Sequence, residues 1–213
     1  MKLIKQSFTL LALLVSFYMS AQVRVDPTPE EKTRAKNLAK KYKNDKDVEV
    51  VILKANETFE FKYDRKYKKM IVLQSSKEEL MNIKDRAHIA KAVFYDSNST
   101  VTKFKVLSKI NRTLHQKVFD EYVKVNDLFY HDQRVKYTGF KFPMQGYKFK
   151  FEFEKKITDP KYFISVYFIK SQPIIKNTIK FVIPKTVDVT LKEMNFTGYD
   201  IKKKKYYNPK KKA

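Results

Sequence analysis

The chain has 213 residues, no cysteine and a formal net charge of +23. The lack of a thiol excludes cysteine nucleophiles, disulfides and thiolate metal sites, and the three glycines are too few for a glycine-rich phosphate loop. Hydrophobic residues make up 43% of the sequence and aromatic residues 15%, which is enough for a packed core rather than a disordered chain.

Residues 1–21 have the three parts of a secretory signal peptide. Lys2 and Lys5 give a basic start, residues 8–19 form an apolar run, and Ser20-Ala21-Gln22 suits cleavage after Ala21. The apolar run is shorter than the roughly 20 residues that a membrane-spanning helix needs. We therefore expect a periplasmic or secreted protein with no transmembrane segment in its mature chain.

Residues 22–47 are expected to form an accessory helix and a linker. Thr28-Pro29-Glu30-Glu31 has the pattern of a capping box, in which Thr28 caps the helix and Glu31 reaches back to it. A narrow apolar stripe at helical spacing follows, formed by Ala35, Leu38, Ala39 and Tyr42. The helix should end near Lys43, before the polar residues 44–47.

From Val48 onward the hydrophobic period changes from about 3.6 residues to 2, which is typical of strands with one wet face. The alternation is clearest at 147–153, where aromatic residues alternate with lysine and glutamate. Similar segments are residues 48–53, 59–63, 69–73, 90–95, 102–107, 135–142, 178–183 and 187–194. Short strands without helical crossovers predict a mainly β protein, an antiparallel β-sandwich over residues 48–201 with one N-terminal accessory α-helix.

Two further segments complete the β pattern. Residues 162–169 are apolar on both faces, which predicts a central strand covered on each side. Residues 113–131 fit either a helix or a strand around 119–123, and a strand is the preferred interpretation. Aromatic side chains such as Phe149 and Tyr162 are expected in the core rather than on a ligand platform.

Residues 202–213 form a basic tail with lysines at 202–205 and 210–212. Such charge runs are typical of solvated tails, and electrostatic contact with an acidic partner is the alternative. Arginine supplies only six of the 46 basic residues, although arginine is the residue that pairs best with phosphates and base edges. Nucleic acid is therefore not an expected partner, and the excess of lysine indicates a compositional bias or a surface for acidic polymers.

The histidines do not indicate a metal site or an acid–base pair. His88, His115 and His131 lack the spacing of helical or hairpin ligands. His131 and Asp132 are adjacent, so their side chains would point to opposite faces of a strand. The sequence predicts no metal-binding residues and no cofactor.

The carboxylates also have a simple structural interpretation. Glu152 and Glu154 share one strand face with Lys148 and Lys150. A cross-strand charge lattice explains this pattern more simply than a pair of carboxylates for sugar hydrolysis. No activated-serine signature is present either, so we expect no catalytic residues and a protein that is not an enzyme.

Several segments between about Val48 and Ile201 resemble a known family. They are Phe129-Tyr130-His131-Asp132-Gln133-Arg134-Val135-Lys136-Tyr137, Phe140-Lys141-Phe142-Pro143, Gly146, Phe181-Val182-Ile183-Pro184 and Asn195-Phe196-Thr197-Gly198-Tyr199-Asp200. This stretch is similar to the β-rich N-terminal domain of unknown function that precedes the transglutaminase-like core in secreted proteins of Gram-negative bacteria. In that family a downstream papain-like core carries a Cys, His and Asp triad, and none of these residues transfers to a chain without cysteine.

The resemblance implies a non-catalytic accessory β-sandwich that acts as an interaction or structural module. Its implied partner is a transglutaminase-like core or another envelope protein. The alternative is a lysine-rich module that binds acidic cell-envelope polymers or anionic membrane surfaces. Binding of that kind would weaken steeply with salt, because each neutralised charge releases counterions.

Overall fold

The computed structural model describes residues 25–66, 68–124, 132–163, 165–190, 192, 194 and 201–205. The predicted signal peptide lies outside these residues. The described elements are helix α2 (Pro29–Lys41), strands β1 (Val50–Asp64), β2 (Lys69–Asn82), β3 (Ala87–Tyr95), β4 (Ser99–Ser108), β5 (Phe119–Tyr122), β6 (Arg134–Phe142) and β7 (Lys148–Ile157), the 3-10 helix η1 (Pro160–Tyr162) and strand β8 (Asn177–Val182).

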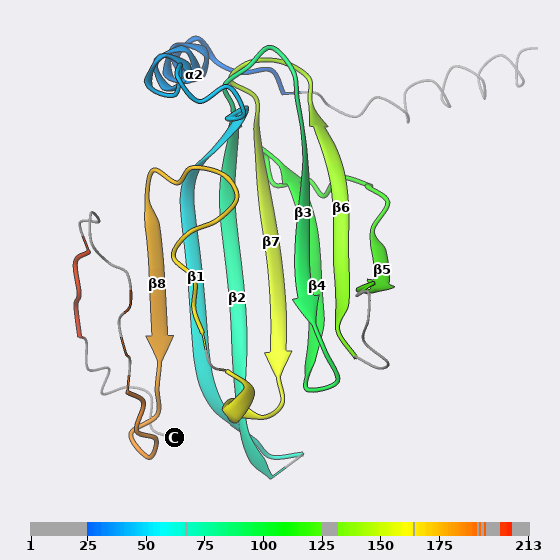
Figure 1. The fold of residues 1–213 in the computed structure, drawn as a ribbon, viewed down its shortest axis with the longest axis vertical. Helices are drawn as coiled ribbons and strands as arrows, with labels where there is room; N and C mark the ends of the chain where they lie inside the picture. The colour runs from blue at the N-terminus through cyan, green and yellow to red at the C-terminus, as the bar shows by residue number, and fades with distance from the viewer. Residues whose placement is uncertain are drawn as a thin grey trace, which may run out of the picture.

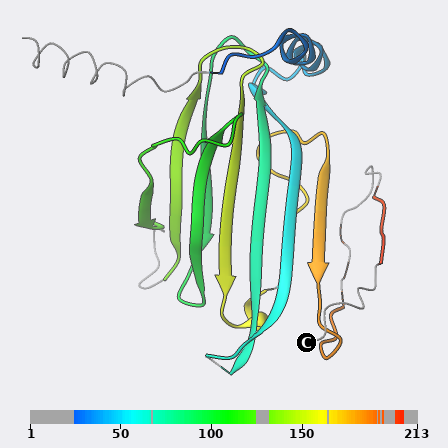
Figure 2. The same cartoon turned by 180° about the vertical axis from the view of Figure 1, so that it is seen from behind.

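The strands form two sheets that pack against each other. The larger sheet has the order β4-β7-β2-β1-β8 and the smaller one the order β3-β6-β5. Neighbouring strands are antiparallel except at the edge of the larger sheet, where β8 runs parallel to β1. Figure 1 and Figure 2 show the smaller sheet on the β4 side of the molecule and β8 at the opposite edge. The predicted mainly β sandwich with one N-terminal helix is confirmed.

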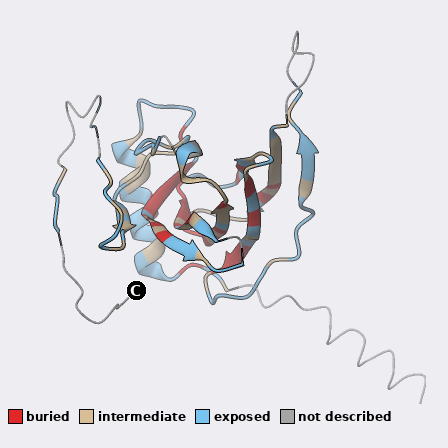
Figure 3. Ribbon diagram, turned by 90° about the horizontal axis from the view of Figure 1, so that it is seen from below, coloured by how far each residue is buried: buried red, intermediate tan, exposed pale blue. Residues whose placement is uncertain are grey.

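The main core lies between the sheets and follows from the alternating pattern of the strands. Phe149, Phe151 and Phe153 of β7 point inward and pack with Phe140 and Phe142 of β6. The ring centroids of Phe142 and Phe149 are 4.8 Å apart. Burial of each such ring contributes on the order of 2–3 kcal/mol. Figure 3 shows that the buried residues are concentrated in the strands.

A second apolar cluster lies further along the inner face of the larger sheet. It contains Phe59, Phe61, Val72 and Ile157. These residues are covered by the segment between η1 and β8, which we call the strap (residues 163–176, of which 164 is not described). The strap contributes Phe163 and Val166 to this cluster. The inner face is thus covered partly by a sheet and partly by a segment without regular structure.

Helix α2 begins as the sequence predicts. The backbone N–H of Glu31 donates to Thr28 Oγ1 at 3.3 Å, and the backbone N–H of Thr28 donates to Glu31 Oε2 at 2.9 Å. Both halves of the capping box are present. The predicted apolar stripe packs on the end of the larger sheet, where Ala35 and Leu38 contact Leu53 and Met81.

Gly146 allows the first turn of the helix to approach the sheet closely. Its φ is +82°, and an added Cβ would lie 3.2 Å from the carbonyl carbon and oxygen of Glu31 and from Cα of Lys32. A side chain would therefore meet backbone atoms, and it would also require a strained left-handed conformation.

The prediction of a central strand at 162–169 is wrong. Tyr162 ends η1, and the described residues that follow have no regular structure. Tyr167 and Ile169 are 77% and 68% exposed, whereas Phe163 and Val166 pack inward. Apolar residues on both sides of a segment do not reveal whether both sides are covered. The neighbouring position beside β1 is taken by β8 instead.

The remaining predicted strands have mixed outcomes. Residues 178–183 correspond to β8, and the strand interpretation of 113–131 is confirmed at β5, although 125–131 are not described. The predicted strand at 187–194 is wrong for its described residues, 187–190, 192 and 194. Val187 and Val189 pack on the second apolar cluster, so their alternation reflects contact without strand pairing.

Candidate functional site

The outer face of the larger sheet, which points away from the smaller sheet, is rich in lysine. Inward positions are identified by the core residues, such as Val72 and Leu80 on β2, and the alternate positions point outward. Exposed outward lysines occur on four of the five strands. Apart from Lys69 at the start of β2, they are Lys54 and Lys62 on β1, Lys77 on β2, Lys105 on β4 and Lys180 on β8. We call these five residues the lysine surface.

Carboxylates balance the lysines on the β4 and β7 side of this face. Lys103 Nζ lies 2.8 Å from Glu152 and 3.5 Å from Glu154, and Lys77 Nζ lies 3.9 Å from Glu152. The predicted cross-strand charge lattice is therefore confirmed. Burial alone would raise the pKa of Glu152, but the hydrogen bond from Lys103 and the positive charges of Lys103, Lys77 and Lys150 together outweigh it, and the net shift is downward.

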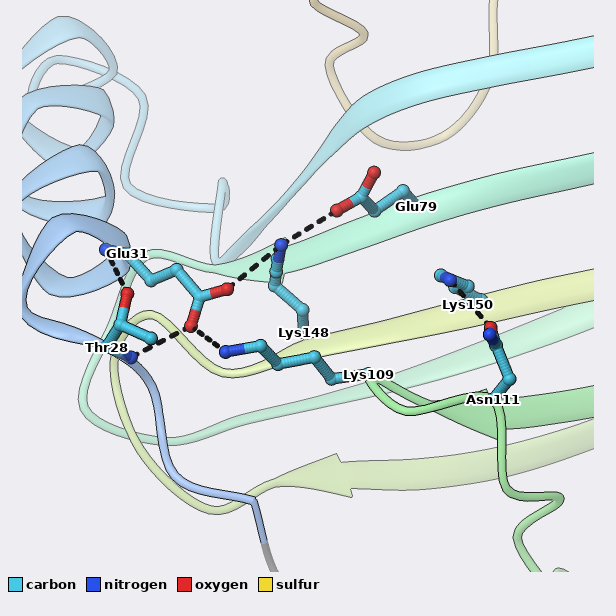
Figure 4. A network of polar contacts seen from close by, with 7 residues as sticks. All are labelled: Thr28, Glu31, Glu79, Lys109, Asn111, Lys148 and Lys150. Atoms are coloured by element: carbon cyan, nitrogen blue, oxygen red, sulfur yellow. Dashed lines mark hydrogen bonds and ion pairs between the residues drawn. The ribbon is translucent and has the colours of Figure 1, made fainter.

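A second ionic network fixes the helix to the same sheet (Figure 4). Glu31 lies 2.6 Å from Lys109 Nζ and 3.0 Å from Lys148 Nζ, and Lys148 also lies 3.0 Å from Glu79. Beside this network Lys150 donates to Asn111 Oδ1 at 2.7 Å. These lysines have partners within the fold, so they are held in place rather than available to a ligand.

The lysine surface differs because most of its members have no acidic partner. Among the described residues, no carboxylate lies within ion-pair distance of Lys54, Lys62, Lys105 or Lys180. Lys77 has only the long contact to Glu152, and its side chain is 64% exposed. Glu60 and Asp64 are the carboxylates on β1 that share this face, and Asp64 lies 2.6 Å from Lys156 Nζ. The β1 and β8 side therefore carries an excess of positive charge.

Neutral polar side chains lie between these lysines. On the outer face, Asn56 is paired with Lys77 and Thr178 in the register of the strands. Thr58 is paired in the same way with Ser75 and Lys180. Hydroxyl and amide groups can donate to or accept from a bound polymer. The outer face of the larger sheet therefore presents a broad polar area with lysines around it.

The histidines, for which the sequence indicates no metal or acid–base role, lie in different parts of the chain. His88 is exposed on β3, His115 is exposed in the segment between β4 and β5, and His131 is not described. Asp132 accepts hydrogen bonds from the backbone and hydroxyl of Ser97. Within the described ranges, no three residues of the His, Cys, Asp or Glu types converge on a possible metal position.

The other residues that the sequence singled out have the following positions. Phe149 is buried in the main core, as predicted. The side chain of Tyr162 is not described. Lysines 202–205 are exposed and outside regular structure, and 206–213 are not described. The helices in the described part of the chain are too short or too polar to cross a membrane.

The sequence predicted an excess of lysine without locating it on one face. A signal was nevertheless present in β1, where Lys54, Asn56, Thr58 and Lys62 occupy alternate positions opposite the apolar ones. What the sequence could not provide is the strand order. Lys180 joins this face because β8 pairs with β1 across more than 100 residues of sequence.

Comparisons with known proteins do not assign this geometry to a family. No model of a known protein family and no curated protein matches the chain. Among solved structures, the chain is similar to a crystal structure of a candidate nutrient binding protein from Legionella pneumophila, with 8% identity and a TM-score of 0.33. The match covers 52% of this chain and spans 40% of that chain. The resemblance to the domain that precedes transglutaminase-like cores stays a prediction.

Proposed function

We propose that the protein is an exported, non-catalytic interaction module whose lysine surface binds an acidic cell-envelope polymer. The observation that carries this proposal is the set of exposed lysines without acidic partners on one face of the larger sheet. As an accessory module, it would act beside a catalytic or structural partner of the envelope, as the sequence resemblance implies.

Charge and shape both support a polymer as the ligand. Neighbouring strands lie about 4.8 Å apart and alternate residues along a strand about 7 Å apart, so the lysines form a two-dimensional array. An extended chain of acidic groups can contact several lysines of such an array at once. A bilayer is a weaker candidate because the exposed members of this face are polar, whereas interfacial binding also uses buried apolar area.

Binding to polygalacturonate, a polymer of acidic sugars, tests the proposal. The chain without residues 1–21 would be compared with the triple variant Lys54→Gln, Lys62→Gln and Lys180→Gln. The matched control replaces three exposed lysines elsewhere, Lys36, Lys84 and Lys141, with glutamine. Both variants lose the same net charge, so a difference between them reports the location of the charge.

We expect the lysine-surface variant to bind about tenfold or more weakly, since it loses three solvent-exposed charge pairs that each contribute on the order of 1 kcal/mol or less. The control variant should bind within about twofold of wild type, because its lysines do not contact the polymer. Equal losses in both variants would overturn the proposal in favour of nonspecific attraction by net charge. Binding to anionic vesicles but not to the polymer would replace the polymer by a membrane surface.

A further inference from the structure

A buried ionic cluster lies on the inner face of the larger sheet, opposite to the lysine surface. Glu57 of β1 and Glu78 of β2 supply its two carboxylates, and their side chains are 7% and 4% exposed. Lys91 of β3 lies 2.7 Å from Glu78. Lys170 of the strap lies 2.8 Å from Glu78 and 3.8 Å from Glu57. The cluster therefore joins both sheets and the strap.

Neutral polar groups complete the site. Gln74 Nε2 donates to Glu57 Oε1 at 2.6 Å, and Lys91 donates to Gln172 Oε1 of the strap at 2.7 Å. The hydroxyl of Ser76 is fully buried and has no hydrogen-bond partner among the described residues. Ser76 lies between Gln74 and Glu78 on the inner face and opposite Glu57 in the strand register. Its free hydroxyl is a polar group aimed into this site.

The two sheets supply only part of the positive charge that acts directly on these carboxylates. Glu57 and Glu78 are two anions, and Lys91 is one cation contributed by the smaller sheet. Lys155 of β7 also attracts Glu57, but at longer range than an ion pair. Among the described residues Lys170 is the lysine within ion-pair distance of Glu57, so without it Glu57 would be buried without a direct ion pair. Burial favours the neutral form of Glu78, but the attraction of Lys91 and Lys170 is stronger and lowers its pKa.

The segment that delivers Lys170 is attached unevenly. Its C-terminal part is tied to β1 by backbone hydrogen bonds between Pro173 and Ile52, Ile175 and Ile52, and Lys176 and Ala55. Before Lys170, the described residues from 165 onward lack regular structure, and Tyr167 and Ile169 point to solvent. Lys170 thus enters the site from a segment that is not part of a strand, although Val166 packs on the second apolar cluster and the carbonyl of Phe168 accepts a hydrogen bond from Asn177.

We propose that Glu57 and Glu78 form a binding site for a primary ammonium group, which the strap's own Lys170 fills in this structure. The ligand class is an alkylammonium, either a small amine or the lysine side chain of a partner. A divalent metal ion is disfavoured because Lys91 already places a positive charge 2.7 Å from Glu78. A guanidinium is also disfavoured, because Lys170 approaches the two carboxylates with a single compact charge.

Chemical rescue of the variant Lys170→Ala tests this proposal. The substitution removes the part of the side chain that corresponds to propylammonium. Thermal unfolding of the variant would be followed with propylammonium chloride, and with the neutral molecule 1-propanol as the matched control. We expect propylammonium to raise the Tm of Lys170→Ala saturably, by roughly 3 °C or more, and to leave the wild type unchanged.

The double variant Lys170→Ala, Glu78→Gln tests whether propylammonium acts at the carboxylate of Glu78. It removes the carboxylate nearest to the ammonium, so the rescue by propylammonium should disappear. If Lys170→Ala does not fold alone, refolding yield with propylammonium against 1-propanol provides the same comparison. Equal effects of the amine and the alcohol, or equal rescue of the double variant, would overturn the proposal. Neither result depends on polymer binding at the lysine surface.

Discussion

Glu31 Oε1 lies 3.0 Å from Lys148 Nζ, and this ion pair joins the first turn of α2 to strand β7. The same carboxylate accepts from the backbone N–H of Thr28 and from Lys109. One side chain therefore closes the capping box of its own helix and links that helix to two parts of the larger sheet. The apolar contacts of Ala35 and Leu38 act alongside it.

Replacing Glu31 with glutamine should lower the free energy of unfolding by about 1–3 kcal/mol, because a partly buried charge that pairs two lysines is lost. Urea unfolding at pH 7, followed by circular dichroism, measures this change. Glu30→Gln is the matched control, since Glu30 lies in the same turn but is exposed. We expect a much smaller effect there, and similar losses in both variants would contradict the role of the network.

The contribution of Glu31 should also depend on pH. Burial alone would raise the pKa of Glu31, but hydrogen bonds from Lys109, Thr28 and Lys148 lower it from 4.5 to about 2. A carboxyl with a lowered folded-state pKa stabilises the fold above its unfolded pKa, and this contribution is lost as the pH falls through the folded value. The stability difference between wild type and Glu31→Gln should therefore be constant from pH 7 to about 5 and shrink between about pH 4.5 and 2. Urea unfolding across this range would show it, and a difference independent of pH would exclude the charge as its cause.

Gly146→Ala should lower the free energy of unfolding by about 1–3 kcal/mol, because the added methyl meets backbone atoms of α2 at a φ that favours glycine. Gly139→Ala is the comparison variant. There the nearest atom is Nε2 of the exposed His88 side chain at 3.0 Å, and that ring can move. Thermal unfolding of both variants should rank Gly146→Ala as the more destabilised, and the reverse order would contradict the close approach of the helix.

The assignment of aromatic residues to core and surface can be tested on Phe149 and Phe94. Phe149 is 5% exposed and contacts three other aromatic rings, whereas Phe94 is 52% exposed. Phe149→Ala should lower the free energy of unfolding by about 3–5 kcal/mol. Phe94→Ala should change it by less than about 1 kcal/mol. Comparable losses in urea unfolding would mean that the smaller sheet does not cover β7 as described.

Local patterns made the helix and many strands predictable. The capping box needs only Thr28 and Glu31, and β7 is visible in three phenylalanines at alternate positions that continue from Tyr147. In contrast, β1 and β2 extend well beyond their predicted segments. Glu57, Ser76 and Glu78 are polar residues at inward positions, so they interrupt the apolar pattern in the middle of both strands.

Those interruptions are compensated by residues far away in the chain. Lys91 and Lys170 neutralise the buried carboxylates, and neither is near them in sequence. The same limitation explains the strap, whose apolar residues look like a covered strand until β8 is known to occupy the place beside β1. The location of the lysine surface likewise depends on strand order, which residue patterns within single strands do not specify.

The salt dependence of polygalacturonate binding tests the lysine surface most directly. Dissociation constants would be measured from about 50 to 300 mM NaCl for wild type and for the variant Lys54→Gln, Lys62→Gln, Lys180→Gln, and plotted as log Kd against log salt concentration. We expect a steep slope for wild type and a slope smaller by roughly 2 for the variant, since each lost contact removes about 0.7–0.9 of a released counterion. Identical slopes for the two proteins would contradict the proposed surface.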